Sequence, residues 1–291
     1  MGCDDGTNPM PIELREERVS HDGQTFVYLT AGEGSPVVLV HGFPDGPQAW
    51  TATALALVAA GHRVLAPYLR GYHPDNVVPG RGYGGEELGE DVIRFMDALG
   101  VERAALVGHD WGAASVQTAT NLAPHRVTKL VSVAIPHARA LKPSPALARA
   151  SRHFVYFKLP WAEAATRRAD FAYLDRIFTR WAPNWSGPQR DAQLAAAKQR
   201  FRDPRVLDGA MGAYRALRAK PSPTTAKRIE VPTLLIGGKA DLGGDPAPFL
   251  ASDRGFVGEF ELLLLDGVGH WPHCERPDEV IPAIVAAVAD A

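Results

Sequence analysis

Residues 107–113 read Val-Gly-His-Asp-Trp-Gly-Ala, between the apolar run Arg103–Val107 and a stretch with helical spacing at Trp111–Leu122. Small residues on both sides of Asp110 suit a sharp strand-to-helix turn, because a Cβ there would clash. Such a turn holds its central side chain above the carboxyl end of a sheet, where the N–H groups of the following helix stabilise an anion. An ordinary helix N-cap is the simpler interpretation of an Asp here. The flanking glycines and the preceding strand favour a reactive carboxylate.

Strands and helices alternate on both sides of this turn. Short continuous apolar runs such as Pro36–Val40 are typical of strands buried on both faces. Strands separated by helices predict an α/β protein with a mostly parallel, doubly wound sheet. The expected strands are a hairpin of Glu13–Ser20 and Thr25–Ala31, then Pro36–Val40, Arg63–Pro67, Arg103–Val107, Lys129–Ala134, Pro232–Ile236 and Glu259–Leu265. The expected helices of this part are Glu87–Leu99, Trp111–Leu122 and Pro277–Asp290.

Residues 137–228 break this alternation, since they are rich in aromatic residues, helical in spacing and poor in strand patterns. They predict a helical cap (lid) domain inserted into a core domain of residues 1–136 and 229–291. Residues 139–230 carry 19 Lys and Arg against 7 Asp and Glu, although the whole chain has a net charge of −2. Solvated helix faces explain this excess most simply. A field that attracts anionic substrates or a membrane surface is the alternative.

The composition fits one large globular domain or one domain with an insertion: of 291 residues, 46% are hydrophobic and 22% charged. No apolar run approaches the roughly 18 residues of a membrane helix, and no secretory leader pattern is visible. We therefore expect a cytoplasmic protein with no nucleic-acid or membrane partner, and leave a homo-oligomer open. Two cysteines, Cys3 and Cys274, give neither a disulfide framework nor a metal set. With no phosphate-binding glycine pattern, we expect no cofactor and no metal.

Three further motifs follow predicted strands in chain order. His41-Gly42-Phe43-Pro44 follows the strand Pro36–Val40. Gly237-Gly238-Lys239-Ala240-Asp241 follows Pro232–Ile236, and Gly267-Val268-Gly269-His270-Trp271 follows Glu259–Leu265. With Asp110 they give the chain order nucleophile, acid, histidine, which hydrolases built on a doubly wound sheet use.

Together these motifs resemble the branch of the α/β-hydrolases that has an aspartate nucleophile and contains epoxide hydrolases and haloalkane dehalogenases. The resemblance implies an α/β-hydrolase fold with Asp110 as nucleophile, Asp241 as charge-relay acid and His270 as base. Asp245 is a weaker rival for the acid, and His273 is a weaker rival for the base.

The resemblance also implies a set of hydrogen-bond donors. The motif His41, Gly42 and Pro44 surrounds Phe43, whose backbone N–H would form an oxyanion hole with that of Trp111. In the cap, Tyr214 matches one tyrosine that hydrogen-bonds the epoxide oxygen in epoxide hydrolases. The position of the other tyrosine holds His153, which would donate through N–H or as imidazolium. Tyr156 is an alternative to His153.

The residue type of the nucleophile limits the chemistry. A carboxylate is charged near neutral pH and attacks an sp³ carbon without activation. Attack by Asp110 on a small-molecule epoxide would leave an alkyl-enzyme ester, which water activated by His270 and Asp241 hydrolyses to release a vicinal diol. We therefore expect an epoxide hydrolase.

Two alternatives remain. A haloalkane or haloacid dehalogenase would use the same nucleophile. Against it, Phe43 stands where many haloalkane dehalogenases have an Asn that binds halide, although Trp161, Trp181 and Trp185 leave a second halide-binding Trp open. A non-catalytic binding module of this fold is the minor alternative.

Overall fold

The sheet of this protein has eight strands in the order β1-β2-β4-β3-β5-β6-β7-β8. The computed structural model describes residues 13–78, 82–218 and 220–289. Cys3 and Asp290, the last residue of the predicted closing helix, lie outside the described residues. The strands are β1 Arg15–His21, β2 Gln24–Ala31, β3 Ser35–Val40, β4 His62–Pro67, β5 Ala104–His109, β6 Val127–Val133, β7 Thr233–Gly238 and β8 Phe260–Leu265.

The pairing confirms the doubly wound prediction. β1 and β2 form an antiparallel hairpin, and β2 pairs with β4 in antiparallel register. All further pairs, from β4 across to β8, are parallel. All six residues of β5 are buried, as expected for the middle of a sheet covered on both faces. The parallel strands therefore end at one edge, and residues that follow them are brought together there.

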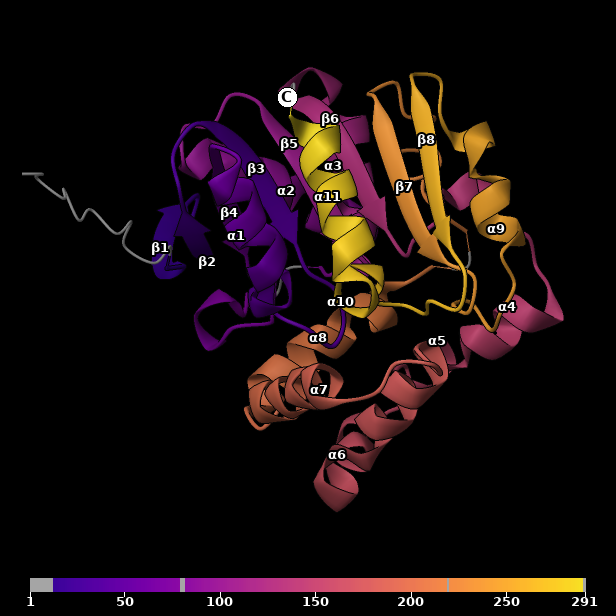
Figure 1. Ribbon diagram of the computed structural model, residues 1–291. Helices are drawn as coiled ribbons and strands as arrows, with labels where there is room; N and C mark the ends of the chain where they lie inside the picture. Colours follow the sequence, from indigo (N-terminus) through magenta and orange to yellow (C-terminus); the bar gives the residue numbers. More distant parts are fainter. Residues whose placement is uncertain (1–12, 79–81, 219, 290–291) are drawn as a thin grey trace, which may run out of the picture.

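Helices cover both faces of the sheet (Figure 1). One face is covered by α1 Thr51–Ala59 and α11 Pro277–Val288, the other by α2 Gly85–Ala98 and α3 Trp111–Leu122. A separate apolar cluster fills each side: Leu57 and Ile284 belong to the first, Phe95 and Val116 to the second. Two short helices, α9 Ala247–Leu250 and α10 Pro272–Glu275, complete the part after β7.

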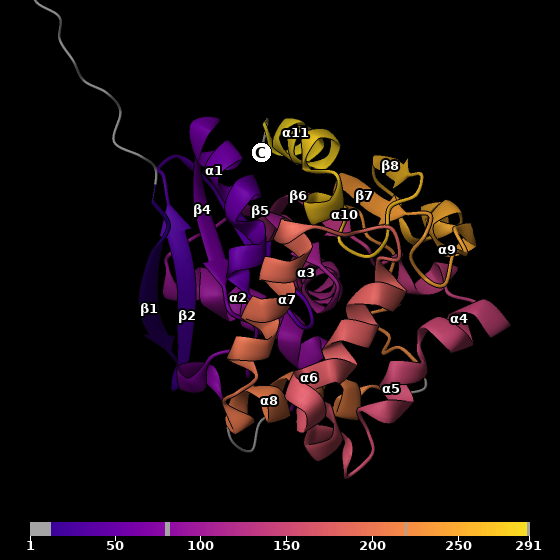
Figure 2. The ribbon, with the colours of Figure 1, turned by 60° about the horizontal axis from the view of Figure 1, so that its bottom comes forward.

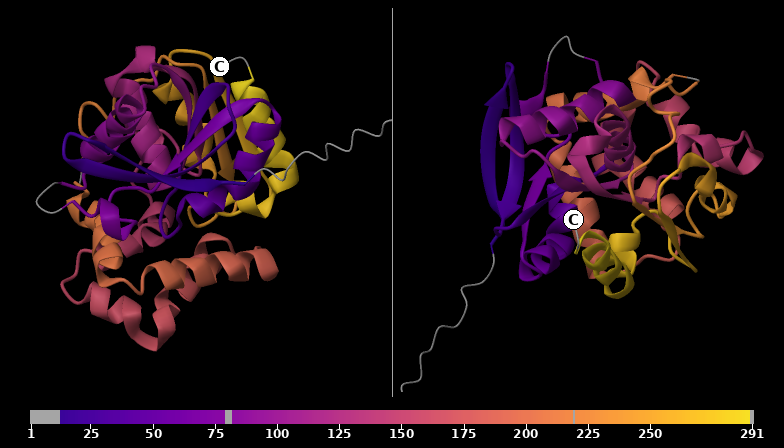
Figure 3. Two further views of the ribbon diagram at one scale, coloured as in Figure 1. Left: turned by 90° about the vertical axis from the view of Figure 1, so that its left-hand side faces the viewer. Right: turned by 90° about the horizontal axis from the view of Figure 1, so that it is seen from above.

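Five helices lie between β6 and β7 in the chain, and we call them the cap helices. They are α4 Pro145–Ala150, α5 Arg152–Tyr156, α6 Ala162–Trp181, α7 Pro188–Arg200 and α8 Pro204–Ala216. Within the described part of 137–228 there is no strand, as predicted. Figures 1 and 3 show the cap helices gathered at the end of the sheet where the parallel strands finish, and Figure 2 brings them forward. No helix of the described residues has both the length and the apolar character needed to cross a membrane.

Candidate active site

The turn between β5 and α3 places Asp110 in a conformation that L residues rarely adopt, with φ 52° and ψ −120°. Gly112 lies so close to β3 that a Cβ on it would collide with the carbonyl oxygen of Val40. A Cβ on Gly108 would collide with the carbonyl oxygen of Gly112. These glycines therefore allow the tight turn that the sequence predicted, and the turn presents a carboxylate at the edge where the strands end.

Three side chains from three different loops meet at this edge. Asp241 follows β7 and His270 follows β8. His270 Nδ1 donates to Asp241 Oδ2 at 2.8 Å, and its Nε2 lies 3.3 Å from Asp110 Oδ2. Asp110, Asp241 and His270 are 8%, 4% and 5% exposed, so the reacting atoms are shielded from bulk water.

Backbone contacts hold this arrangement from both sides. Leu242 N donates to Asp241 Oδ1 at 2.7 Å. His270 N donates to the carbonyl of Trp181, the last residue of α6, at 2.9 Å. The carbonyl of His270 accepts a 2.7 Å hydrogen bond from His109 Nε2. The histidine is thus tied to the cap as well as to the sheet.

The two rivals lie elsewhere. Asp245 accepts a hydrogen bond from the amide of Ala247 at 3.0 Å, as a residue beside a helix start does. His273 is buried and stacks on Trp50 at a centroid distance of 4.2 Å. Neither contacts the group formed by Asp110, Asp241 and His270.

The charges of the three side chains are coupled. Burial disfavours the charge of His270, but the charge of Asp241 and hydrogen bonds with Asp110 and Asp241 outweigh it and raise the pKa of His270 to about 10. Burial likewise acts to raise the pKa of Asp110, but the hydrogen bond and charge of His270 and the amide of Phe43 bring it below its ordinary value. The resting site therefore holds an imidazolium between two carboxylates.

The second carboxylate oxygen of Asp110 has its own donor. Phe43 N donates to Asp110 Oδ1 at 2.8 Å. The loop is fixed by His41, whose Nε2 accepts from Leu69 N at 3.0 Å, and a Cβ on Gly42 would collide with Asp110. The bond between Phe43 and Pro44 is cis. Trp111 N begins α3 and so has no acceptor within the helix, but no hydrogen bond between it and the carboxylate is present in the described structure.

Tyr214 lies in α8 with its side chain fully buried. Its ring meets Trp111 edge to face at 5.2 Å and His153 at 5.5 Å. Burial, and then the charge of Asp110, raise the pKa of Tyr214 well above its ordinary value, while the Trp111 indole acts weakly in the opposite direction. No well-formed hydrogen bond engages its hydroxyl within the described residues. The Tyr214 hydroxyl is therefore neutral, and it lies close enough to Asp110 for the charge of that carboxylate to act on it.

His153 lies beside Tyr214, and its two ring nitrogens differ in what they contact. Its Nδ1 is 3.0 Å from the carbonyl oxygen of Ala150, which only accepts, so Nδ1 carries the proton. Burial lowers the pKa of His153 to about 3, so the ring is neutral and Nε2 is an acceptor. The N–H expected for a leaving oxygen is already used. Tyr156 stacks on Tyr173 at 4.1 Å and makes no ring contact with Tyr214.

Trp181 is one of the three cap tryptophans that the sequence left open, whereas Asp45 carried no sequence signal. The Trp181 ring lies 4.8 Å from His270 and 4.7 Å from His153, whereas Trp161 is 52% exposed and Trp185 packs on Phe178. Asp45 is buried behind the site. Only the packing of α6 and of the loop after β3 places them, because neither residue belongs to a spaced motif.

Comparison with known proteins agrees with this geometry. Residues 35–277 match the family model described as alpha/beta hydrolase fold. The chain is 31% identical to epoxide hydrolase A of Mycobacterium tuberculosis (strain ATCC 25618 / H37Rv), over 93% of this chain and 96% of that protein. It is 29% identical to epoxide hydrolase 4 of Homo sapiens, over 90% of this chain and 75% of that protein.

A solved structure is similar over nearly the whole length. Epoxide hydrolase A from Mycobacterium thermoresistibile superposes with a TM-score of 0.78 at 26% identity, covering 95% of this chain and 98% of that chain. The chain belongs to the α/β-hydrolase fold family and, within it, to the branch that contains the epoxide hydrolases.

Proposed function

We propose that this protein hydrolyses small-molecule epoxides to vicinal diols through a covalent ester on Asp110. One observation carries the proposal: Asp110 Oδ1 is held by the amide of Phe43 while Oδ2 lies beside His270, with the Tyr214 ring packed above Trp111. The carboxylate is thereby oriented for attack, and a neutral O–H donor lies close to where a leaving oxygen would form.

In the first step Asp110 Oδ2 attacks a ring carbon of the epoxide, and the bond from that carbon to the ring oxygen breaks. Tyr214 donates its proton to the developing alkoxide, which becomes the hydroxyl of a hydroxyalkyl ester. A positioned proton donor contributes about 10² to 10⁴ in rate. His153 Nε2 accepts from that new hydroxyl, because a hydroxyl, unlike an alkoxide, has a proton to share.

Ester formation prepares the second step. It removes the negative charge of Asp110, one of the groups that raise the pKa of His270. The imidazolium then loses its Nε2 proton, which restores the Tyr214 hydroxyl by way of water. The neutral ring takes a proton from the water that attacks the ester carbonyl, and the bond from Asp110 Cγ to Oδ2 then breaks. The diol oxygen that leaves takes the proton back from His270, and the new Asp110 carboxyl gives its own proton to the ring, so that carboxylate and imidazolium are both restored. Negative charge develops on Oδ1, where the Phe43 amide already donates and the Trp111 amide would be the second donor. Asp241 keeps the other ring nitrogen protonated throughout.

A haloalkane or haloacid dehalogenase is the second candidate. Trp181, between His270 and His153, is the observation that favours it, since an indole N–H is a donor suited to halide. The same ester would form, with halide rather than alkoxide leaving.

Intact mass of the variant His270→Gln separates these candidates. Glutamine removes the base, so the ester accumulates when substrate is added. An epoxide should add its whole mass, whereas a haloalkane would add its mass less hydrogen halide. Asp110→Asn is the matched control and should form no adduct. An adduct on both variants, or on neither, across a panel of epoxides and haloalkanes contradicts the proposal.

We further propose that residues 137–228 act as a cap domain over a core of residues 1–136 and 229–291. A cytoplasmic location and self-association remain predictions. So does the expectation of no cofactor, no metal and no nucleic-acid or membrane partner.

A further inference from the structure

Arg180, the second-last residue of α6, has an unusual environment. Its Nε and Nη2 atoms are both buried and make no well-formed hydrogen bond in the described part of the chain. No other arginine of the described residues has both of these atoms buried and unpartnered. Buried donors of a charged group are costly unless they are paired, so such a pair indicates a missing partner.

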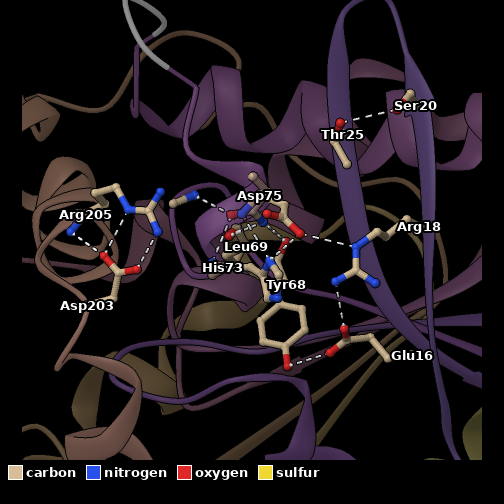
Figure 4. A network of polar contacts seen from close by, with 12 residues as sticks. Glu16, Arg18, Ser20, Thr25, Tyr68, Leu69, His73, Asp75, Asp203 and Arg205 are labelled. Carbon is tan, nitrogen blue, oxygen red and sulfur yellow. Dashed lines mark hydrogen bonds and ion pairs between the residues drawn. The ribbon is translucent and has the colours of Figure 1, made fainter.

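Nε and Nη2 lie on the edge of the guanidinium that commonly binds a carboxylate through two parallel hydrogen bonds. Among the described residues, two other arginines use this edge to bind a carboxylate. Arg70 donates from Nε and Nη2 to Asp91 at 2.6 and 2.5 Å. Arg205 donates from the same atoms to Asp203 at 3.1 and 2.7 Å (Figure 4). In Arg180 the edge has no carboxylate.

The location connects Arg180 to the leaving-group side of the active site. The next residue, Trp181, packs against both His153 and His270. Two turns earlier in α6, Tyr173 packs on Tyr156 and Phe157 of the segment that carries His153, and α5 and α6 lie next to each other in Figures 1 and 2. The charge of Arg180 lowers the pKa of His153, and Tyr214 acts on the pKa of Arg180 in turn.

The charged surroundings favour an anion from outside the chain. Burial, and then the charge of Arg152, lower the pKa of Arg180. Tyr173, which makes a loose hydrogen bond with Arg180, and Tyr214 act in the opposite direction, but both are neutral phenols and supply no charge to pair with the guanidinium. No carboxylate is among the groups that act on it most strongly, and no ion pair to Arg180 is present in the described residues. Arg152 is exposed at the start of α5 and adds a second positive charge near Arg180.

We infer that Arg180, with the positive charge of Arg152 nearby, binds a carboxylate of the substrate. The preferred substrates are then epoxides that carry a carboxylate on the same carbon chain. This inference rests on the proposed epoxide hydrolysis and names its substrate class. The aromatic rings of Tyr173, Phe157 and Trp181 would pack against the carbon chain of the substrate between its epoxide and its carboxylate. One guanidinium with two parallel donors matches the two oxygens of one carboxylate. The excess of positive charge in the cap would attract this anion.

The test compares ω-epoxy carboxylates of several chain lengths with the matching ω-epoxy primary alcohols. A charge-assisted pair contributes about 1.5–3 kcal/mol, so kcat/KM should favour the acid by about 10- to 100-fold at the best chain length. Arg180→Met should remove this preference mainly through KM for the acid. Arg180→Lys keeps the positive charge but loses the two parallel donors, so it should retain only part of the preference for the acid. Arg176→Met, an exposed arginine of the same helix, is the matched control and should keep the full preference.

Thermal unfolding with octanoate separates failure of this inference from failure of the proposed function. Octanoate has no epoxide, and it should raise Tm of the wild type and of Arg176→Met, but not of Arg180→Met; octanol should raise none of them. If the octanoate shift is the same in Arg180→Met, the carboxylate site is wrong even when epoxides are hydrolysed. If octanoate binds through Arg180 but no epoxide is hydrolysed, the proposed reaction is wrong and the anion site stands. If Arg180→Met does not fold, an undiminished acid preference in Arg180→Lys overturns the inference.

Discussion

At the scale of single residues, the tautomer of His153 determines how the leaving oxygen would receive its proton in the mechanism we propose. A tyrosine donates whatever else it contacts, because its O–H rotates, but an imidazole with one proton donates from one nitrogen only. In His153 that proton is committed to the carbonyl of Ala150. In the mechanism we propose, Tyr214 is therefore the one donor for ring opening, and His153 acts on the hydroxyl that results.

We predict that Tyr214→Phe slows ester formation by about 10²-fold, because the positioned donor is lost. His153→Phe should slow the same step by less than about tenfold, because no donor is removed. Single-turnover measurement of the Trp181 and Trp111 fluorescence on mixing with epoxide reports this step.

Tyr156→Phe is the matched control, since Tyr156 stacks on Tyr173, and it should behave as the wild type. Equal slowing of ester formation by His153→Phe and Tyr214→Phe would show instead that His153 donates as an imidazolium.

At the scale of elements, the turn between β5 and α3 depends on the distance between α3 and β3. Gly112 has no room for a Cβ because the backbone at Val40 and His41 occupies that space. Backbone atoms do not move aside as the end of a side chain does, so the strain falls on the whole turn.

We predict that Gly112→Ala lowers the free energy of unfolding by at least about 2 kcal/mol and abolishes turnover, because α3 and Asp110 must shift. Gly85→Ala is the control. Gly85 begins α2, and a Cβ there would lie 3.8 Å from the Thr225 hydroxyl oxygen, an ordinary contact. It should stay within about 1 kcal/mol of the wild type. Urea denaturation measures both, and similar values for the two would contradict the tight approach of α3 to β3.

Elements with a clear period or a continuous apolar run were predictable from the sequence. The expected strand Arg103–Val107 is β5 with one or two residues changed at its ends, and Glu87–Leu99 is α2 begun two residues earlier. Helix α1 was not predicted, because Thr51–Ala59 is small and apolar on nearly all sides and shows no amphipathic period. The break inside α6, where Arg168–Phe171 leave helical geometry, has no Gly or Pro to signal it.

The same distinction applies to the site. Asp110, Asp241 and His270 follow strand ends, so the parallel sheet brings them together and short motifs suffice to find them. The protonated nitrogen of His153 and the unpaired edge of Arg180 depend on packing between α5 and α6. Sequence spacing does not encode these contacts, because the two helices are joined by a loop of unpredictable course.

At the scale of the whole molecule, the cap is fastened to the core through a buried carboxylate. Asp45, in the loop after β3, accepts hydrogen bonds from Gln193 Nε2 of α7 at 2.8 Å and from the indole N–H of Trp271 at 2.7 Å. Arg200 of α7 reaches the same loop, donating to Gln48 Oε1 at 3.0 Å. Figure 3 shows the cap helices gathered against one end of the core. Stability of the cap on the core should therefore follow the charge of Asp45.

Burial raises the pKa of Asp45 from 3.8 to about 6, although the hydrogen bonds from Trp271 and Gln193 act to lower it. A carboxyl whose pKa is higher in the folded state binds its proton more tightly there than in the unfolded chain. Its contribution to stability is thus fully present below pH ~4 and is lost as the pH rises through about 6. Asp45→Ala has no such proton, so we predict that it is more destabilising relative to the wild type at pH ~4.5 than at pH ~7.5, by about 2 kcal/mol.

Gln193→Leu supplies the matched variant, because it removes one hydrogen bond that lowers the pKa of Asp45 and leaves the carboxyl in place. The interval over which stability is lost should move to higher pH in this variant, whereas in Asp45→Ala it should vanish. Urea denaturation of the three proteins across this pH range measures both effects. A difference between wild type and Asp45→Ala that does not change with pH would mean that Asp45 keeps its charge when folded, and that the link between cap and core does not respond to pH.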